Sequence, residues 1–86
     1  MKTRKQEYGT ANVIGKRVEK LRKERGFSQK QFIAKLQLEG VDINATSYSK
    51  LEGQIRSATD KEVYYIAKIL HLKMENLFPE DIDDKI

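Results

Sequence analysis

The fold is decided by residues 26–52, which read GFSQKQFIAKLQLEGVDINATSYSKLE. Ser28 and Gln31 form a capping box, a pair of side chains that satisfies two unpaired amides at the start of a helix. The apolar residues that follow share one helical face: Phe32, Ile33 and Leu36. We therefore predict a helix that begins after Ser28 and ends near Leu38.

A second, shorter helix follows in the same stretch. Residues 39–43 form a connector in which Gly40 is the expected pivot, and Asn44 is a favoured residue at a helix N-cap. The helix then runs for about eight or nine residues to Glu52, and Gly53 ends it. Only two apolar residues of this helix share a face toward the core: Tyr48 and Leu51.

Further helical segments flank this stretch. Residues 13–25 place apolar side chains on one face, and Gly26 fits a left-handed cap at their end. Thr59 and Glu62 form a second capping box, which opens an apolar helix that has His71 at its end. A final short turn closes the core with four residues: Leu72, Met74, Leu77 and Phe78. Because no strand-like alternation occurs, we predict an all-α fold of five helices.

Composition narrows the functions that the chain can have. Its 86 residues include no cysteine and a single histidine, His71, which argues against a zinc site. The sequence contains no nucleophile paired with a base, no glycine-rich phosphate loop and no cluster of metal ligands, so we expect neither catalysis nor a cofactor. No apolar run reaches the roughly 20 residues that span a bilayer, and no apolar segment follows the basic N-terminus. We therefore expect a cytoplasmic protein without a membrane partner.

Charge is distributed unevenly along the chain. Residues 1–35 carry 11 Lys or Arg against 3 Asp or Glu, whereas residues 79–86 carry 1 against 4. We divide the chain into a basic flexible arm (1–11), a helical domain (12–78) and an acidic tail (79–86). A basic half attracts polyanions such as DNA, although a solvated helix face has the same pattern. The acidic tail is either a solvated segment or a competitor of DNA for the basic surface.

The helix that begins at Asn44 is polar on its outward side. The residues there are small or form hydrogen bonds: Ala45, Thr46, Ser47, Ser49 and Lys50. Small residues let a helix enter the major groove closely, and Asn, Thr, Ser and Lys side chains can bond base edges there. The preceding helix would then cross the DNA backbone, with Gln29 and its first amides near phosphate. The alternative is an exposed helix of an ordinary bundle.

Seven short segments follow one another along the chain: IGKR (14–17), LR (21–22), GFSQ (26–29), LE (51–52), TDKE (59–62), IAKIL (66–70) and LF (77–78). In this order and spacing, residues 14–78 resemble the Cro/repressor-type (XRE-like) helix-turn-helix family. The resemblance implies a five-helix, lambda-repressor-like domain that binds operator DNA as a transcriptional regulator, with repression as the expected action. It also implies a homodimer bound to a two-fold site in double-stranded DNA.

The resemblance assigns roles to individual residues. It implies base contacts for Asn44, Ala45, Thr46, Ser47 and Lys50, and backbone phosphate contacts for Gln29, Lys30 and Arg56. Gln29 is also implied to brace the third helix. Lys50 is the best candidate for a guanine contact, because an ammonium can donate to O6 and N7. Arg22 on the first helix and Glu52 at the end of the third are implied to form an ion pair that orients the third helix. Tyr48 occupies a position that is usually aliphatic, so we expect a core residue whose hydroxyl reaches the surface.

One departure from the family and two alternatives accompany this interpretation. The segment between Leu36 and Glu52 is longer than in the commonest family members, and its additional residues, at 38–43, influence the angle of the third helix. The same fold also serves antitoxins and protein-interaction modules that mask a partner. Met74, Leu77 and Phe78 fit either the core or a dimer contact.

Overall fold

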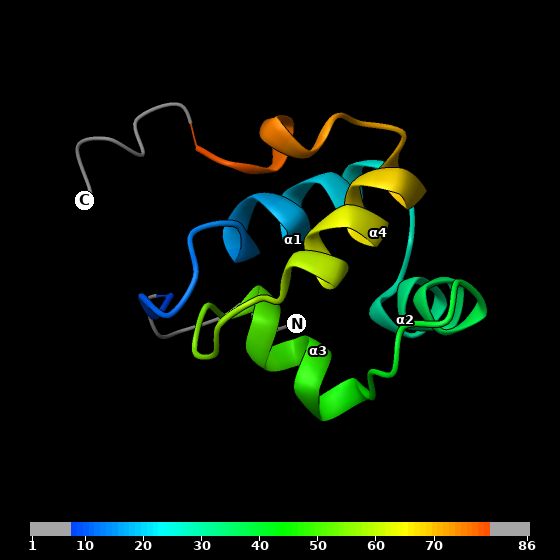
Figure 1. The fold of residues 1–86 in the computed structure, drawn as a ribbon, viewed down its shortest axis with the longest axis horizontal. Coiled ribbons are helices and arrows are strands. Elements are labelled where there is room, and N and C mark those ends of the chain that lie inside the picture. The colour runs from blue at the N-terminus through cyan, green and yellow to red at the C-terminus, as the bar shows by residue number, and fades with distance from the viewer. Residues whose placement is uncertain (1–7, 80–86) are drawn as a thin grey trace.

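The structure, a computed structural model, describes residues 8–79, which contain no strand. Its elements, shown in Figure 1, are α1 (Gly15–Glu24), α2 (Gln29–Leu38), α3 (Ala45–Glu52), α4 (Asp60–Leu70) and the 3-10 turn η1 (Met74–Leu77). The all-α prediction is confirmed for these residues. None of their helices is long and apolar enough to cross a membrane. Residues 1–7 of the predicted arm and 80–86 of the predicted tail lie outside the described residues.

The prediction of a fifth α-helix is wrong. Residues 74–77 form one 3-10 turn, and Phe78 returns to an extended conformation with φ −93° and ψ 146°. The physical reason is Pro79, because the residue before a proline is disfavoured in the helical region. Leu77 closes the core as expected, but Met74 and Phe78 are 47% and 37% exposed.

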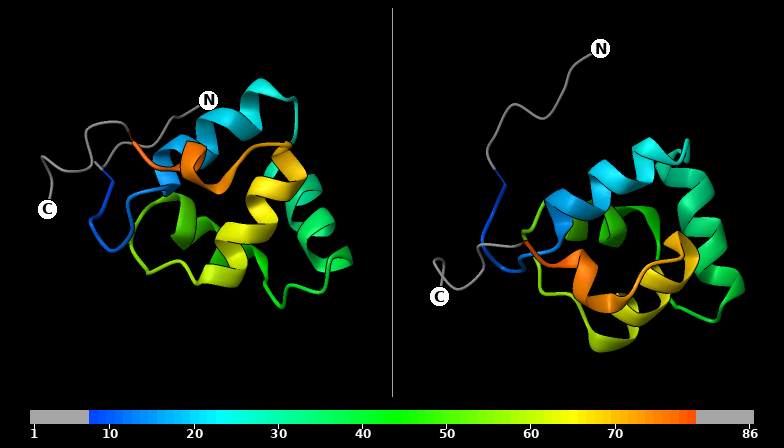
Figure 2. Two further views of the ribbon diagram at one scale, coloured as in Figure 1. Left: turned by 45° about the horizontal axis from the view of Figure 1, so that its top comes forward. Right: turned by 90° about the horizontal axis from the view of Figure 1, so that it is seen from above.

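The helices enclose one hydrophobic core. Figure 1 shows α1 and α4 side by side, with α3 beneath them and α2 at one end, and Figure 2 shows η1 packed against α4. The largest buried side chains include Tyr48, Phe32, Ile14, Leu36 and Leu51. The rings of Phe32 and Tyr48 have centroids 5.7 Å apart, so an aromatic contact joins α2 to α3.

The caps predicted from the sequence are confirmed. Ser28 and Thr59 each accept a hydrogen bond from the third helical amide, and both capping boxes are complete. Asn44 caps α3 through a bond from the Ser47 amide at 2.8 Å. Gly26 and Gly40 have φ values of 80° and 93°, a conformation that glycine adopts without strain at the end of a helix.

The N-terminal boundary differs from the prediction. The helix expected from residue 13 begins at Gly15, because the Asn12 carboxamide oxygen accepts the amides of Ile14 and Gly15 at 3.0 and 2.8 Å. Residues 8–11, assigned to the flexible arm, are bonded to the turn that follows α3. Within them, the Gly9 amide donates to the carbonyl of Gly53 at 2.9 Å. The folded unit therefore includes residues before 12.

Candidate nucleic-acid interface

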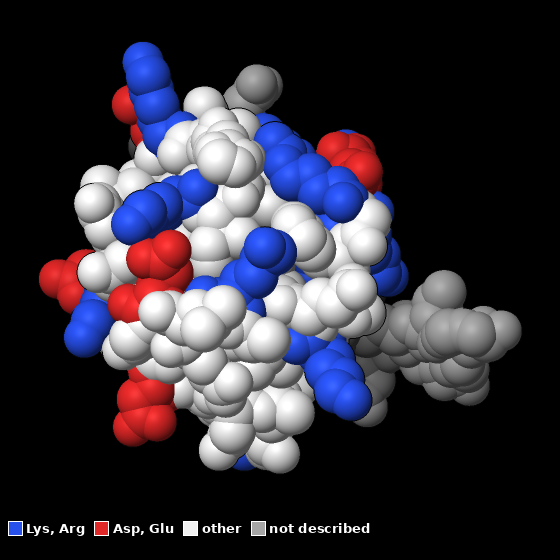
Figure 3. All heavy atoms as spheres, turned by 90° about the vertical axis from the view of Figure 1, so that its right-hand side faces the viewer, with Lys and Arg blue, Asp and Glu red and all other residues white. Residues whose placement is uncertain are grey.

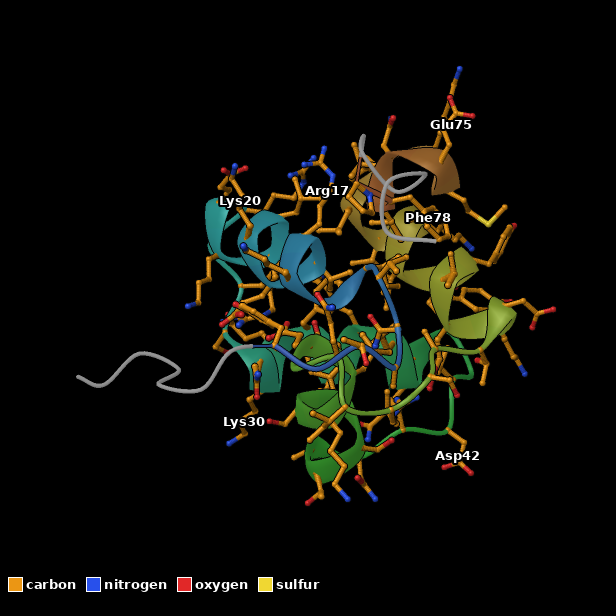
Figure 4. The ribbon with its side chains drawn as sticks, turned by 90° about the vertical axis from the view of Figure 1, so that its left-hand side faces the viewer. Arg17, Lys20, Lys30, Asp42, Glu75 and Phe78 are labelled. Carbon is orange, nitrogen blue, oxygen red and sulfur yellow. The ribbon has the colours of Figure 1, made fainter. Side chains whose placement is uncertain are left out.

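One side of α3 faces solvent along its whole length. Its exposed residues are Asn44 at the cap, Ala45, Thr46, Ser49 and Lys50. Ser47, which was also predicted to contact bases, is half-buried. The only acidic residue of α3, Glu52, is completely buried, so the exposed side carries no negative charge. Figure 4 shows α3 at the lower side of the molecule, with Lys30 of α2 beside it.

Glu52 is the centre of a buried hydrogen-bonded cluster. The Arg22 guanidinium meets it twice, with Nε 2.7 Å from Oε2 and Nη2 3.2 Å from Oε1. The Gln29 carboxamide donates to Oε1 at 3.0 Å, and the Tyr48 hydroxyl donates to Oε2. The predicted Arg22–Glu52 ion pair is therefore confirmed, and it joins α1, α2 and α3 at one point.

Burial and the carboxylate of Glu52 together set the pKa values of Tyr48 and Arg22 in this cluster. Burial raises the pKa of Tyr48, and the nearby charge of Glu52 raises it further, so the hydroxyl stays a donor. Burial alone would lower the pKa of Arg22, but the hydrogen bond and charge of Glu52 outweigh it and the pKa is raised. The expectation that the Tyr48 hydroxyl reaches the surface is wrong. The residue is fully buried, and its hydroxyl finds a partner inside because an unpaired buried donor is costly.

Arg56 holds the other end of α3. Its Nε donates to the Ser47 carbonyl at 2.9 Å, and Nη1 donates to the Ser57 carbonyl at 2.7 Å. Nη1 and Nη2 also meet the two carboxylate oxygens of Glu62, each at 2.9 Å. Four of the five N–H groups of this guanidinium thus have protein acceptors. The phosphate contact of Arg56 stays a prediction, and the structure adds a role that the sequence did not indicate.

Glu62, the partner of Arg56, has a lowered pKa that favours this ion pair. Burial alone would raise the pKa of Glu62, but hydrogen bonds from Arg56 and from Thr59 outweigh it, so the pKa is lowered. Glu62 was assigned only to the capping box of α4, where its Oε1 accepts the Thr59 amide at 2.9 Å. One carboxylate therefore caps α4 and ties it to the turn after α3.

The C-terminal end of α3 is packed tightly against the start of α1. A methyl group on Gly15 would lie 2.3 Å from the Leu51 carbonyl oxygen and 2.6 Å from that of Glu52. The Asn12 carboxamide nitrogen donates to the carbonyls of Leu51 and Arg56 at 3.0 and 2.8 Å. These contacts fix the depth at which α3 sits against α1.

Gln54 completes this junction. It has a left-handed backbone, with φ 61°, at the place where the sequence suggested that Gly53 would end the helix. Its carboxamide oxygen accepts the Lys16 amide at 2.9 Å, and its nitrogen donates to the Asn12 carbonyl at 2.9 Å. An Asn shortly before a helix is a recognisable cap signal, so Asn12 was within reach of the sequence. Gln54 carries no comparable signal.

The predicted phosphate contacts of α2 lie beside α3. Lys30 is exposed, and Gln29 is half-buried because its side chain reaches Glu52. Gln29 therefore braces α3, as the resemblance implied, while its bond to phosphate stays a prediction. Figure 3 shows most carboxylates toward the left of the face that it displays, while Lys and Arg are spread over the whole face, the left side included.

Neither a metal site nor a known relative indicates the function of this protein. Among residues 8–79, no three His, Cys, Asp or Glu side chains gather where they could hold a metal ion. Comparisons of the chain with protein-family models, curated proteins and solved structures find no match. The function is therefore inferred from α3 and its surroundings.

Proposed function

We propose that this protein is a sequence-specific DNA-binding transcriptional regulator that reads the major groove with α3. The observation that carries the proposal is the contrast within α3, whose solvent side is polar and free of carboxylates while Glu52 ties it to two other helices. In this proposal α2 and α3 form the helix-turn-helix of a lambda-repressor-like domain. Repression is the expected action.

The chemistry of the exposed side suits base edges. Thr46 and Lys50 are four residues apart and therefore lie on one side of the helix, and both are exposed. Lys50 can donate to guanine O6 and N7, and the methyl groups of Ala45 and Thr46 can contact thymine. Beside them, Lys30 offers a cation to the phosphates that border the groove.

The size of α3 supports a dimer. Its eight residues extend over about 12 Å, which is close to the roughly 12 Å width of the major groove. A helix of this length reaches only a few base pairs, so a single copy would bind with little specificity. We infer that two copies bind a two-fold site, with half-sites about one helical turn apart.

Selection from a library of randomised duplexes tests the proposal. We expect an enriched two-fold motif that binds at least about 1,000-fold more tightly than a shuffled duplex, as measured by fluorescence anisotropy. Lys50→Ala should weaken binding to the motif by about 5- to 150-fold, the effect of one lost base contact. Lys61→Ala is the matched control, because Lys61 is an exposed lysine of α4 and its loss makes the same charge change.

The proposal fails if no motif is enriched and all duplexes bind equally at every salt concentration. A stable complex with a protein partner, in the absence of such a motif, would instead support a protein-interaction module of the antitoxin kind.

A further inference from the structure

Three cations stand together near the start of α1. Lys20 comes four residues after Lys16 and three after Arg17, so its side chain neighbours both on the helix surface. We call Lys16, Arg17 and Lys20 the α1 basic cluster. The first turn of α1 holds no acidic residue. Like charges at this spacing repel one another, and an anion placed over them would relieve that repulsion.

Among residues 8–79, no carboxylate forms an ion pair with this cluster, although Glu24 comes four residues after Lys20. In the part of the chain that the structure describes, the ion pairs of Arg22, Lys23, Arg56 and Lys68 account for the carboxylates in contact with cations. None of these pairs includes a member of the α1 basic cluster. Lys16 lies 5.8 Å from the centre of the Tyr8 ring. The nearby Glu19 carboxylate accepts the Tyr8 hydroxyl and pairs with Lys23.

The chain returns to this cluster immediately before its most acidic segment. Arg17 Nε donates to the Asn76 carbonyl at 2.6 Å, so the backbone at η1 touches the cluster three residues before Pro79. Figure 4 shows Arg17 between Lys20 and Phe78 on the upper side of the molecule, away from Lys30 and α3. Residues 80–84 then carry four carboxylates, at Glu80, Asp81, Asp83 and Asp84.

We propose that the α1 basic cluster is the docking surface for residues 80–84 of the same chain. The reach is sufficient, since five extended residues span about 16 Å while Lys16 and Lys20 are about 6 Å apart along the helix. The charges are complementary, and the Arg17–Asn76 bond holds the chain beside the cluster four residues before Glu80. With its cations neutralised, this side of α1 would no longer attract nucleic acid in competition with α3.

Carbodiimide cross-linking of the full chain, followed by peptide mapping, tests the proposal without DNA and therefore independently of the proposed function. The reagent joins a lysine to a carboxylate that is in contact with it. We expect links between Lys16 or Lys20 and residues 80–84 within one chain, and their yield should fall about three-fold or more in 1 M salt, where exposed pairs are screened. Mixing isotopically labelled and unlabelled protein distinguishes links within a chain from links between chains.

A second measurement uses the amide chemical shifts of residues 80–84. In Lys16→Gln/Lys20→Gln, these shifts should move toward the values that the wild type shows in 1 M salt. Lys35→Gln/Lys61→Gln is the matched control, with the same charge change at exposed lysines of α2 and α4, and it should leave the shifts unchanged.

Three results would overturn the proposal. Links from residues 80–84 to Lys30 or Lys50 would place the segment on the predicted DNA-reading surface instead. Links only between chains would mean that the segment acts on a second copy. Absence of links, with shifts that do not respond to Lys16→Gln/Lys20→Gln, would show that the segment makes no contact with α1.

Discussion

The two ends of α3 are held in different ways. At its C-terminal end Glu52 is completely buried and receives hydrogen bonds from Arg22, Gln29 and Tyr48. At its N-terminal end the cap is exposed, and the main tertiary bond comes from Arg56, whose side chain is 23% exposed. The difference indicates that one end sets the position of the helix while the other displays its side chains.

The two ends of α3 differ in how much stability is lost when a charged side chain loses its partner. A buried charge needs its partners, because an uncompensated charge in the interior is far more costly than one in water. A partly exposed ion pair has water as an alternative partner, so its loss costs less. Changes at the C-terminal end should therefore disturb folding, and changes at the N-terminal end should disturb it much less.

The largest effect is expected from Glu52→Ala. It leaves the buried Arg22 charge and the Tyr48 hydroxyl without their acceptor, and we expect a loss of about 3–5 kcal/mol in the free energy of unfolding. Urea unfolding followed by circular dichroism measures it. Glu24→Ala is the matched control, because Glu24 is an exposed carboxylate of α1, and it should change stability by less than about 0.5 kcal/mol.

Glu52→Gln is a milder second variant, which can be measured even if Glu52→Ala does not fold. The amide oxygen still accepts a hydrogen bond while the charge is lost, so a smaller loss of about 2 kcal/mol is expected. Wild-type stability in Glu52→Gln would contradict the view that this end positions α3.

Gly15→Ala probes the close approach of α1 to the same end. Helix propensity alone predicts that this change stabilises the protein by about 0.5–1 kcal/mol. The new methyl group would overlap the Leu51 and Glu52 carbonyl oxygens, so we expect a net destabilisation of about 1–3 kcal/mol instead. Thermal unfolding measures the sign. Ala34→Gly, at an exposed position of α2, calibrates propensity in this chain and should cost about 1 kcal/mol. A stabilised Gly15→Ala would show that the junction tolerates separation.

The smallest effect belongs to the Arg56–Glu62 pair at the N-terminal end. Because the folded state lowers the pKa of Glu62, the pair's contribution is present above the unfolded value, about 4.3. It is lost as pH falls through the lower folded pKa. We expect Arg56→Met to cost about 1 kcal/mol at pH 7 and to flatten the fall in unfolding temperature below about pH 4. If the two proteins lose stability in parallel over that range, the pair does not set this pH dependence.

The local part of the fold was predictable from the sequence. The capping boxes at Ser28 and Thr59 and the cap at Asn44 involve residues only three apart, so the signal and the structure lie in the same short segment. Glycines at 26 and 40 marked chain reversals for the same reason. The fifth helix was overestimated because apolar spacing alone does not include the effect of Pro79 on the preceding residue.

The candidate site was predictable only in part. The Arg22–Glu52 pair and the bracing of α3 by Gln29 followed from a family resemblance, but the bond of the Tyr48 hydroxyl to the same carboxylate did not. The contacts of Asn12 and Gln54 join residues more than 35 positions apart, and no local pattern encodes such pairs. The resemblance assigned Arg56 to phosphate. Its pairing with Glu62 was not predicted, because Glu62 already had a local role at the cap of α4.

The sequence by itself determined where helices start, which side of each is apolar and which side of the helix at Asn44 is polar. These properties depend on neighbouring residues, through backbone hydrogen bonds and the helical repeat. Only the tertiary structure decided that the Tyr48 hydroxyl bonds Glu52 inside the core, that Gln54 and Asn12 seat that helix on α1, and that Arg56 faces inward. Those contacts depend on which distant groups packing brings within hydrogen-bond distance, and burial then makes each one costly to leave unpaired.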